Sequence, residues 1–384
     1  MSTLKVSALQ GLSASSDAIT LANDGTCTAN ITNNLSNRNK IINGAMTVSQ
    51  RNGTSAVQLS ASEQYFIDRW ENDSGSSFDM KCDASQSSEA PEGFANSMKF
   101  DCDGVSAVSG SHNGLITTFL EGQDLQDLKF GTSNAEDITL SFYAKSGSQN
   151  NGHVYGVFLG AYLNGTRNAQ TKGFTVTSSW QRFTMTFAGT GTVTSTGINN
   201  NNSKGMQVAF SLAVGPDDDE NYSTWTANSG LLGFTGQDNF FDNTSNELYI
   251  TGVQLEVGSV ATDFEHRSYG QELALCKRYY QQFPQSPADA YGPIGSGRIR
   301  NSTNAHIIVF FPEMRSSPTC TKVGDLRILH AATSTAVNSV ASSHMARNIV
   351  FVEGIVSSGL TQGEGCMMTA NNDSSGKITL SAEL

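Results

Sequence analysis

Charged residues are scarce in this chain of 384 residues, and most of them are acidic. Asp, Glu, Lys and Arg make up 15% of the sequence, and the formal net charge is −12 at pH 7. An acidic surface gains no counterion-release affinity for nucleic acid or for anionic lipid. We therefore expect neither nucleic acid nor a membrane surface as a partner.

Long apolar runs are absent as well. No stretch reaches the ~18 consecutive apolar residues of a membrane span. The N-terminal sequence MSTLKVSALQGLSAS has no apolar core of the kind found in a signal peptide. We expect a protein that is made and folded in a cytosol and does not insert into a membrane.

Cysteine is infrequent and follows no metal-binding pattern. The six cysteines, which show no CxxC or Cys/His ligand spacing, are Cys27, Cys82, Cys102, Cys276, Cys320 and Cys366. Cys82 and Cys102 fall on neighbouring predicted strands, so a disulfide between them stays open, although a cytosolic origin disfavours it.

Local catalytic motifs are also missing. The sequence contains no G-x-S-x-G elbow, no H-E-x-x-H and no Walker loop. His266, between Glu265 and Arg267, fits a structural hydrogen bond better than catalysis. We expect no enzyme, with one alternative: glycosidase carboxylates come from distant strands and leave no local signature.

What the sequence does contain is a repeated alternation of short apolar runs with turn formers. Runs separated by Gly, Ser, Thr and Asn at intervals of roughly 8–12 residues are typical of β-sandwiches. The length suggests two domains with an extension. We predict an all-β protein with an N-terminal β arm (1–36), a jelly-roll-like β-sandwich body (37–267), a short linking α-helix (268–283), a linker (284–302) and a C-terminal β-sandwich tip (303–384).

The body is the best-patterned part. Val208, Phe210, Leu212 and Val214 alternate with other residues, as expected of a half-buried strand. Residues 249–257 alternate in the same way and are expected to return beside the first strand. Long polar loops, which in compact domains usually bind or form interfaces, are expected at 83–96, 144–152, 188–205 and 215–246.

The linking helix is predicted from its start signal and its period. Ser268 and Gln271 have the spacing of a capping box. Four residues recur at three- and four-residue steps, share one helical face and are expected to pack at the junction or in a trimer interface: Tyr269, Leu273, Cys276 and Tyr280. Pro284 is expected to end the helix.

The arm contains short strand-like pieces joined by turn formers, with Asn23-Asp24-Gly25 as a hairpin turn. Either it is a disordered tail, or it orders by pairing with the edges of neighbouring chains. Its apolar residues favour the second interpretation.

Two sets of residues, one aromatic and one acidic, are candidates for ligand binding. Aromatic residues in or beside the 215–246 loop, which would stack on a sugar ring or else anchor the loop to the core, are Tyr222, Trp225, Phe240 and Phe241. The acidic run Asp217, Asp218, Asp219 and Glu220 is either a solvated loop or a calcium site, since calcium prefers oxygen ligands. A structural calcium ion is the one cofactor that the sequence suggests.

Several segments together resemble phage tail-fibre and related virion proteins, especially those of marine phages. The most specific segment is ITGVQLEVGSVATDFEHRSYGQELALCKRYY (250–280). Further segments that resemble this family are KIINGAMTVSQRNGT (40–54), YFIDRW (65–70), ITLSFYAKS (138–146), SWQRFTMTF (179–187), FPEMRSSPT (311–319) and ITLSAEL (378–384). The body also resembles jelly-roll carbohydrate-binding modules, in which calcium tends to lie near a first-strand Asn-Gly step such as Asn43-Gly44.

The resemblance implies a structural virion protein made in the host cytoplasm. We expect a trimeric tail fibre or related appendage that docks to tail or capsid proteins through its N-terminal arm and contacts a host-surface glycan or protein distally. The alternatives are a carbohydrate-binding module outside any virion and a decoration or fibre protein on the capsid.

Overall fold

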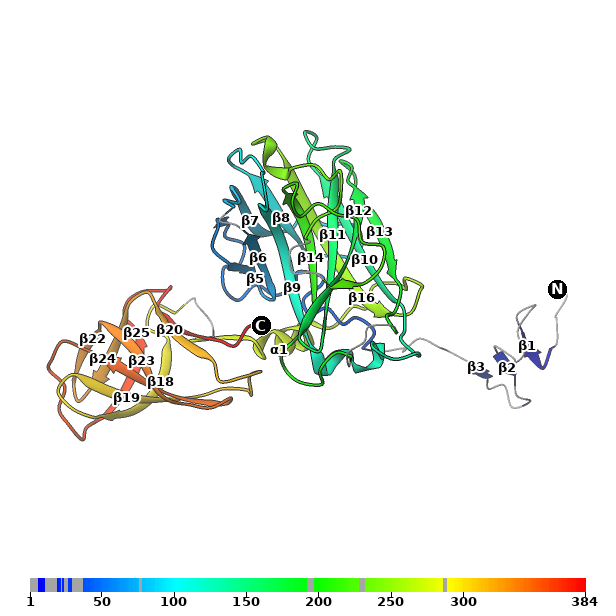
Figure 1. The fold of residues 1–384 in the computed structure, drawn as a ribbon. Helices are drawn as coiled ribbons and strands as arrows, with labels where there is room; N and C mark the ends of the chain where they lie inside the picture. The colour runs from blue at the N-terminus through cyan, green and yellow to red at the C-terminus, as the bar shows by residue number, and fades with distance from the viewer. Residues whose placement is uncertain are drawn as a thin grey trace, which may run out of the picture.

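The computed structural model describes residues 6–10, 19–21, 23, 27–29, 37–75, 78–191, 197–227, 232–285 and 289–384. Within these ranges the chain is almost entirely β-structure, as predicted. Figure 1 shows a large β-sandwich, the body, and a smaller β unit, the tip, with helix α1 between them. No helix among the described residues is long and apolar enough to cross a membrane.

The described part of the arm forms a small antiparallel sheet. Its strands are β1 (Ala8–Leu9), β2 (Ile19–Leu21) and β3 (Cys27–Ala29), in that order. Leu21 pairs with Cys27, as expected for a hairpin, although Asp24 and Gly25 of the predicted turn lie outside the described residues. The apolar side chains of Val6, Leu9 and Leu21 are exposed.

The body consists of two antiparallel sheets packed face to face. One has six strands in the order β13-β10-β16-β8-β7-β4, and the other has seven in the order β15-β12-β11-β14-β9-β6-β5. The strands are β4 (Val57–Leu59), β5 (Gln64–Ile67), β6 (Trp70–Gly75), β7 (Cys82–Ser87), β8 (Ser97–Cys102), β9 (Asn113–Glu121), β10 (Ile138–Ser146), β11 (Val154–Leu163), β12 (Thr166–Thr175), β13 (Gln181–Phe187), β14 (Lys204–Val214), β15 (Thr226–Ala227) and β16 (Glu247–Val257). Two short 3-10 helices are η1 (Gly122–Leu128) and η2 (Phe240–Asp242).

Aromatic rings fill the space between the two sheets. Phe142 of β10 meets Phe210 of β14 edge to face, with ring centroids 4.9 Å apart. Trp70 lies 6.1 Å from Phe210. These rings are fully buried, and such contacts add to the stabilisation from burial alone. The predicted alternation of β14 is present, with Val208, Phe210 and Leu212 in the core.

The first segment of the body joins the last strand by isolated hydrogen bonds, not by a ladder. The Lys40 amide donates to the Leu255 carbonyl (2.9 Å), and the Val253 amide donates to the Gly44 carbonyl (2.9 Å). Residues 37–50 contain no assigned strand, although the first segment was expected to be one. A Cβ at Gly44 would lie 2.1 Å from the Val253 oxygen, so only glycine permits this approach.

The tip also has two sheets. A three-stranded sheet has the order β17-β26-β20, and a seven-stranded sheet has the order β22-β21-β25-β18-β19-β24-β23. The strands are β17 (Tyr280–Phe283), β18 (Pro293–Ile299), β19 (Asn304–Phe310), β20 (Thr319–Val323), β21 (Leu326–His330), β22 (Thr333–Val337), β23 (Ser339–Met345), β24 (Ile349–Ile355), β25 (Gly365–Ala370) and β26 (Lys377–Ser381). Alternate residues such as Ile307, Val309, Val350 and Val352 form its separate core.

The linking helix is shorter than predicted. Helix α1 spans Tyr269–Lys277, and its Ser268–Gln271 capping box is present as predicted. Tyr280–Phe283, expected to continue the helix, is strand β17 and pairs with β26. The spacing of Cys276, Tyr280 and Phe283 suits a helix, but the ladder to β26 satisfies the backbone instead. The tip therefore begins with β17, within the range predicted to be helix. It also includes β18, within the range predicted to be a linker.

Cys82 and Cys102 lie directly opposite each other on β7 and β8. Both are free thiols and buried. Burial raises the pKa of each thiol, most strongly that of Cys82. A high pKa keeps a thiol protonated and unreactive.

Candidate functional site

An open cleft lies where the two sheets of the body part at one edge. One side is formed by β12 of the seven-stranded sheet and the other by β13 of the six-stranded sheet, and Asn221, Tyr222, Ser223 and Phe234 add a rim. Its volume is about 700 Å³ and its lining residues are Thr171, Lys172, Gly173, Phe174, Thr175, Phe183, Thr184, Met185, Thr186, Asn221, Tyr222, Ser223 and Phe234. This size is within the range of small-ligand sites.

The floor of the cleft is apolar. Phe174 and Phe183 meet edge to face with centroids 5.2 Å apart. Phe183 also stacks on Phe142 of the core at 5.3 Å, which fixes the position of its ring. Met185, two residues along β13, completes the floor. The half-buried ring of Phe183 is therefore held by the core and remains partly accessible.

The rim is built on a glycine. A Cβ at Gly173 would lie 2.5 Å from the ring of Phe234, so the ring lies directly on the backbone of β12. Tyr222 is tied to the same strand, because its amide donates to Thr171 Oγ1 (3.1 Å) and its carbonyl accepts from the Thr171 amide (3.2 Å). The Tyr222 hydroxyl donates to the Glu220 carboxylate.

Both strands beside the cleft have open edges. β13 is the last strand of its sheet. β15 pairs with β12 at Asn168 and Ala169 alone, and within the described residues no strand extends this pairing to Lys172–Thr175. Backbone polar groups near the cleft thus add to the side chains of Ser223 and Asn221, which are polar and exposed. An apolar floor with polar groups around it suits a ligand that has both apolar faces and hydroxyl groups.

The four predicted sugar-binding aromatics have different positions. Tyr222 lines the cleft. Trp225 is half-buried: its indole donates to the Ala188 carbonyl (2.6 Å) and its ring contacts Phe130. Phe240 and Phe241 are fully buried in the core, where Phe241 packs on Phe78 and Phe240 on Tyr155. Phe240 and Phe241 therefore anchor the loop to the core, which was the alternative to sugar binding, and they cannot stack on a sugar.

The predicted calcium ligands do not form one site. Asn43 is buried, and its side chain bonds to Val48 and to the Asp68 carbonyl. The Asp217 amide bonds to Gly110 and the Asp218 amide to Gly215, in a different loop. Asp219 shares that loop, where its carbonyl accepts from Thr235. Burial, and then the charge of Asp217, raise the pKa of Asp218. Among the described residues no group of three His, Cys, Asp or Glu side chains is arranged to hold a metal.

The predicted helical face is not a single surface. Tyr269 is 61% exposed and Leu273 is half-buried. Cys276 is buried, and Tyr280 is buried within strand β17. The shared face expected from their spacing is absent, because the chain leaves the helix before Tyr280.

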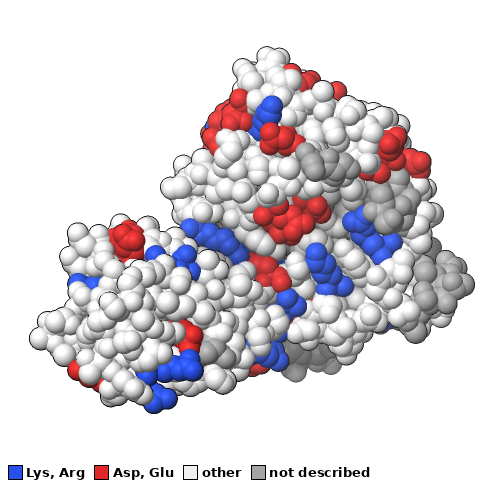
Figure 2. Space-filling model, turned by 60° about the vertical axis from the view of Figure 1, so that its left-hand side comes forward, with Lys and Arg blue, Asp and Glu red and all other residues white. Residues whose placement is uncertain are grey.

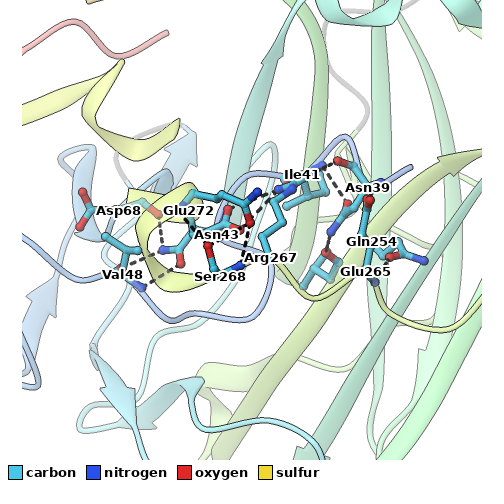
Figure 3. A network of polar contacts seen from close by, with 12 residues as sticks. Asn39, Ile41, Asn43, Val48, Asp68, Gln254, Glu265, Arg267, Ser268 and Glu272 are labelled. Carbon is cyan, nitrogen blue, oxygen red and sulfur yellow. Dashed lines mark hydrogen bonds and ion pairs between the residues drawn. The ribbon is translucent and has the colours of Figure 1, made fainter. Parts of the chain in front are cut away.

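Helix α1 is instead held to the body through its acidic residue Glu272. Figure 3 shows this polar network. Glu272 accepts from the Asn43 amide at 2.5 Å and forms an ion pair with Arg267 at 3.4 Å. Arg267 in turn donates to the carbonyls of Ile41 (3.0 Å) and Asn39. The segment 250–280 is therefore hydrogen-bonded to the first residues of the body.

The tip is fastened to the body by buried charges. Glu383, next to the last residue, forms ion pairs with Arg51 (2.9 Å) and with Arg69 of the body. The guanidinium of Arg69 also lies 3.6 Å from the ring centroid of Tyr279. Arg315 and Asn202 exchange hydrogen bonds of 2.8 and 2.7 Å. These contacts indicate that body and tip form one joined unit.

On the face shown in Figure 2, acidic and basic residues lie interspersed, without an extended patch of one sign.

No protein family model matches the chain, and no curated protein matches it. Among solved structures, the chain is similar to the enzymatically active domain of tailspike protein 4 of bacteriophage CBA120 (12% identity, TM-score 0.31). That match covers 57% of this chain and 21% of the tailspike chain.

Similar structures also include carbohydrate-binding modules. One is the family 11 module of a Clostridium thermocellum cellulosomal cellulase (14% identity, TM-score 0.26, 56% of this chain and 99% of that chain). Another is a xylan-binding domain of Paenibacillus barcinonensis (9% identity, TM-score 0.28, 55% and 99%). Because every TM-score is below 0.5, these similarities carry no assignment of function.

Sequence reasoning missed most of the cleft. Phe183 and Met185 lie in the segment SWQRFTMTF (179–187), which was noted above only for its resemblance to virion proteins. Phe183 and Met185 line the cleft because β13 lies at a sheet edge that faces β12. No local sequence pattern predicts this position.

Proposed function

We propose that this chain is a structural component of a phage particle, a tail fibre or related appendage, and that it binds host-surface glycan through the cleft between β12 and β13. The observation that carries the glycan part is the cleft itself, with its apolar floor of Phe174, Phe183 and Met185 beside two open strand edges. The virion part rests on the sequence resemblance.

The cleft matches the chemistry of a sugar. The carbon-bound hydrogens of a pyranose form an apolar face that packs on an aromatic ring, while its hydroxyls need hydrogen-bond partners. Phe183 and Tyr222 offer rings. The hydroxyl of Ser223 and the side-chain amide of Asn221 offer such partners. The proposal assigns no catalytic step.

The arm is the part proposed to dock to tail or capsid proteins. Its small sheet exposes the side chains of Val6, Leu9 and Leu21. Exposed apolar residues and unpaired strand edges favour association with another chain.

We further propose that the chain is a homotrimer. The helical face that was expected at the trimer interface is not formed, because Tyr280 lies in strand β17. Tyr269 on α1 and Phe310 on β19 nevertheless expose 61% and 72% of their surface. Copies of the chain around a common axis would cover such rings.

The tip is proposed to make a second contact with the host surface. The outer face of its larger sheet places Ile308 opposite Phe351 and Leu329 opposite Met367, with Phe310 beside them. An isolated tip used to test this contact by competition must begin before Tyr280, because β17 pairs with β26.

Two measurements test the proposal. The purified full chain is applied to an array of bacterial surface glycans, and purified particles are probed with an antibody to the chain. Binding to a glycan subset together with the presence of the chain in particles is expected. No binding to any glycan would overturn the glycan part, and absence from particles would overturn the virion part.

The rival functions separate in the same measurements. Glycan binding without incorporation into particles would identify a carbohydrate-binding module outside a virion. Incorporation into capsids that lack tails would identify a decoration or fibre protein of the capsid.

A further inference from the structure

The cleft contains one charged side chain, Lys172. All other residues that line it are neutral. Lys172 lies opposite Val157 on the paired strand β11, and Val157 is a core residue. Lys172 therefore projects from the inward face of β12, and its stem follows the apolar interior to the open edge of the sandwich.

The ammonium group of Lys172 lies near an aromatic ring. Its Nζ is 5.3 Å from the ring centroid of Phe187, a buried residue of β13. Contact with a ring attracts a cation, but less strongly than a carboxylate at hydrogen-bond distance. Among the described residues, no carboxylate forms an ion pair with Lys172. This contrasts with Lys99, Lys129 and Lys145, each of which has an acidic partner.

One acidic residue is near the rim of the cleft. Glu220 accepts a hydrogen bond from the Tyr222 hydroxyl, and its carbonyl accepts from Thr171 Oγ1 at 2.9 Å. Its carboxylate is thus engaged by Tyr222 and is not part of the lining. In a chain with a net charge of −12, the cleft is thus lined by one cation and by no acidic side chain.

We propose that the glycan bound in this cleft carries an anionic group, a carboxylate or a sulfate, which pairs with Lys172. The inference rests on the proposed glycan function and specifies its ligand class. A sugar packed on the partly accessible ring of Phe183 would exclude water from the Lys172 ammonium. Lower local dielectric strengthens a charge-assisted hydrogen bond.

The test is an array that contains neutral, carboxylated and sulfated glycans in matched backbones, probed with the full chain. We expect binding to one of the anionic sets, and the array distinguishes carboxylate from sulfate. Lys172→Met should weaken that binding about tenfold or more, the scale of one hydrogen bond to a charged group. Lys172→Arg should restore it. Raising the salt concentration should weaken binding of the natural chain more than binding of Lys172→Met.

Lys204→Met is the matched control. Lys204 is also a cation over an aromatic ring, with Nζ 3.6 Å from the Phe119 centroid, but it does not line the cleft. The Lys204→Met substitution removes the same charge as Lys172→Met and should leave anionic glycan binding unchanged. Thermal denaturation of each variant confirms that the body is folded.

The outcomes separate the two claims. Binding of neutral glycans alone, or equal binding of anionic glycans by the natural chain and Lys172→Met, would overturn the inference and leave the proposed function intact. Binding of no glycan would overturn both.

Discussion

The carboxylate of Glu121 and the guanidinium of Arg278 form a two-pronged ion pair across the base of the body. Nε donates to Oε1 and Nη2 to Oε2, each at 2.7 Å. Glu121 ends β9 of the body and is fully buried, while Arg278 follows helix α1. The Tyr279 hydroxyl adds a third bond to Oε1 at 2.6 Å. One carboxylate of the body thus holds the chain where it enters the tip.

Loss of this pair should be costly. Arg278→Ala leaves the buried Glu121 without its cation, and breaking a buried pair in this way destabilises proteins by about 3–5 kcal/mol. Chemical denaturation is expected to show a loss of this size. Lys129→Ala breaks the exposed pair with Glu136 and should change stability by less than about 1 kcal/mol. Equal effects of the two changes would mean that the junction pair has no special role.

Glu71, close to the same junction, should make stability depend on pH. Burial raises the pKa of Glu71 to about 8, and the neighbouring Glu383 adds to the rise. In the unfolded chain this carboxyl ionises near pH ~4.3. Between these two values the folded protein holds a proton that the unfolded chain has released. The contribution of Glu71 to stability therefore falls as pH rises from about 4.3 to about 8, and then stays level.

The substitution Glu71→Gln tests whether the contribution of Glu71 to stability falls as pH rises. The substitution should stabilise the protein relative to the natural chain more at pH 8.5 than at pH 5, by at least about 1 kcal/mol, since one pKa unit corresponds to about 1.4 kcal/mol. Urea denaturation at the two pH values measures the difference in stability.

Glu121→Gln should have the opposite pH dependence. Burial acts to raise the pKa of Glu121, but the hydrogen bonds from Arg278 and Tyr279 outweigh it and lower that pKa. Its stabilisation is present above pH ~4.3 and is lost as pH falls through the folded pKa.

Removal of the arm should leave the body intact. A chain that begins at Asn37 keeps Arg38, which donates to Thr262 Oγ1 at 2.5 Å, and Asn39, which donates to the Val253 carbonyl at 3.1 Å. Its thermal transition is expected to match that of the full chain, while it fails to join particles. A chain that begins at Asn43 lacks both residues and Ile41 of the core, and should unfold at lower temperature. If removal of residues 1–36 alone lowers the transition, the arm belongs to the fold.

Strand and capping patterns were sufficient to predict much of the architecture. The alternation of Val208, Phe210 and Leu212 predicted a strand, and these residues lie on the inward face of β14. Ser268 and Gln271 predicted the start of α1. In both cases the signal is local, because side-chain direction follows directly from the period of the backbone.

Features that depend on distant segments were not predictable in this way. Phe240 and Phe241 stand in a polar loop, and their burial depends on contacts with residues distant in the sequence, such as Phe78 and Tyr155. Tyr280 fits a helical period, but the partner strand β26 lies near the other end of the tip sequence. The cleft is lined by Lys172 of one sheet and Phe183 of the other. Its lining residues can therefore be identified only from the assembled sandwich.

Tyr269 should contribute to association of copies. In the single chain its ring is 61% exposed on α1, so Tyr269→Ala should leave the thermal transition of a dilute sample nearly unchanged. Sedimentation is expected to show trimers for the natural chain and weaker association for the variant. A natural chain that sediments as a monomer at micromolar concentration contradicts the proposed trimer.

The most direct test of the account is the affinity of the cleft for its glycan. The glycan identified on the array is titrated calorimetrically into the natural chain, Tyr222→Ala and Tyr291→Ala. Tyr222 lines the cleft, whereas Tyr291 is an exposed tyrosine of the tip. Tyr222→Ala, with an unchanged thermal transition, is predicted to bind at least about tenfold more weakly, and Tyr291→Ala is predicted to bind like the natural chain. Unchanged affinity in a folded Tyr222→Ala variant would contradict glycan binding in this cleft.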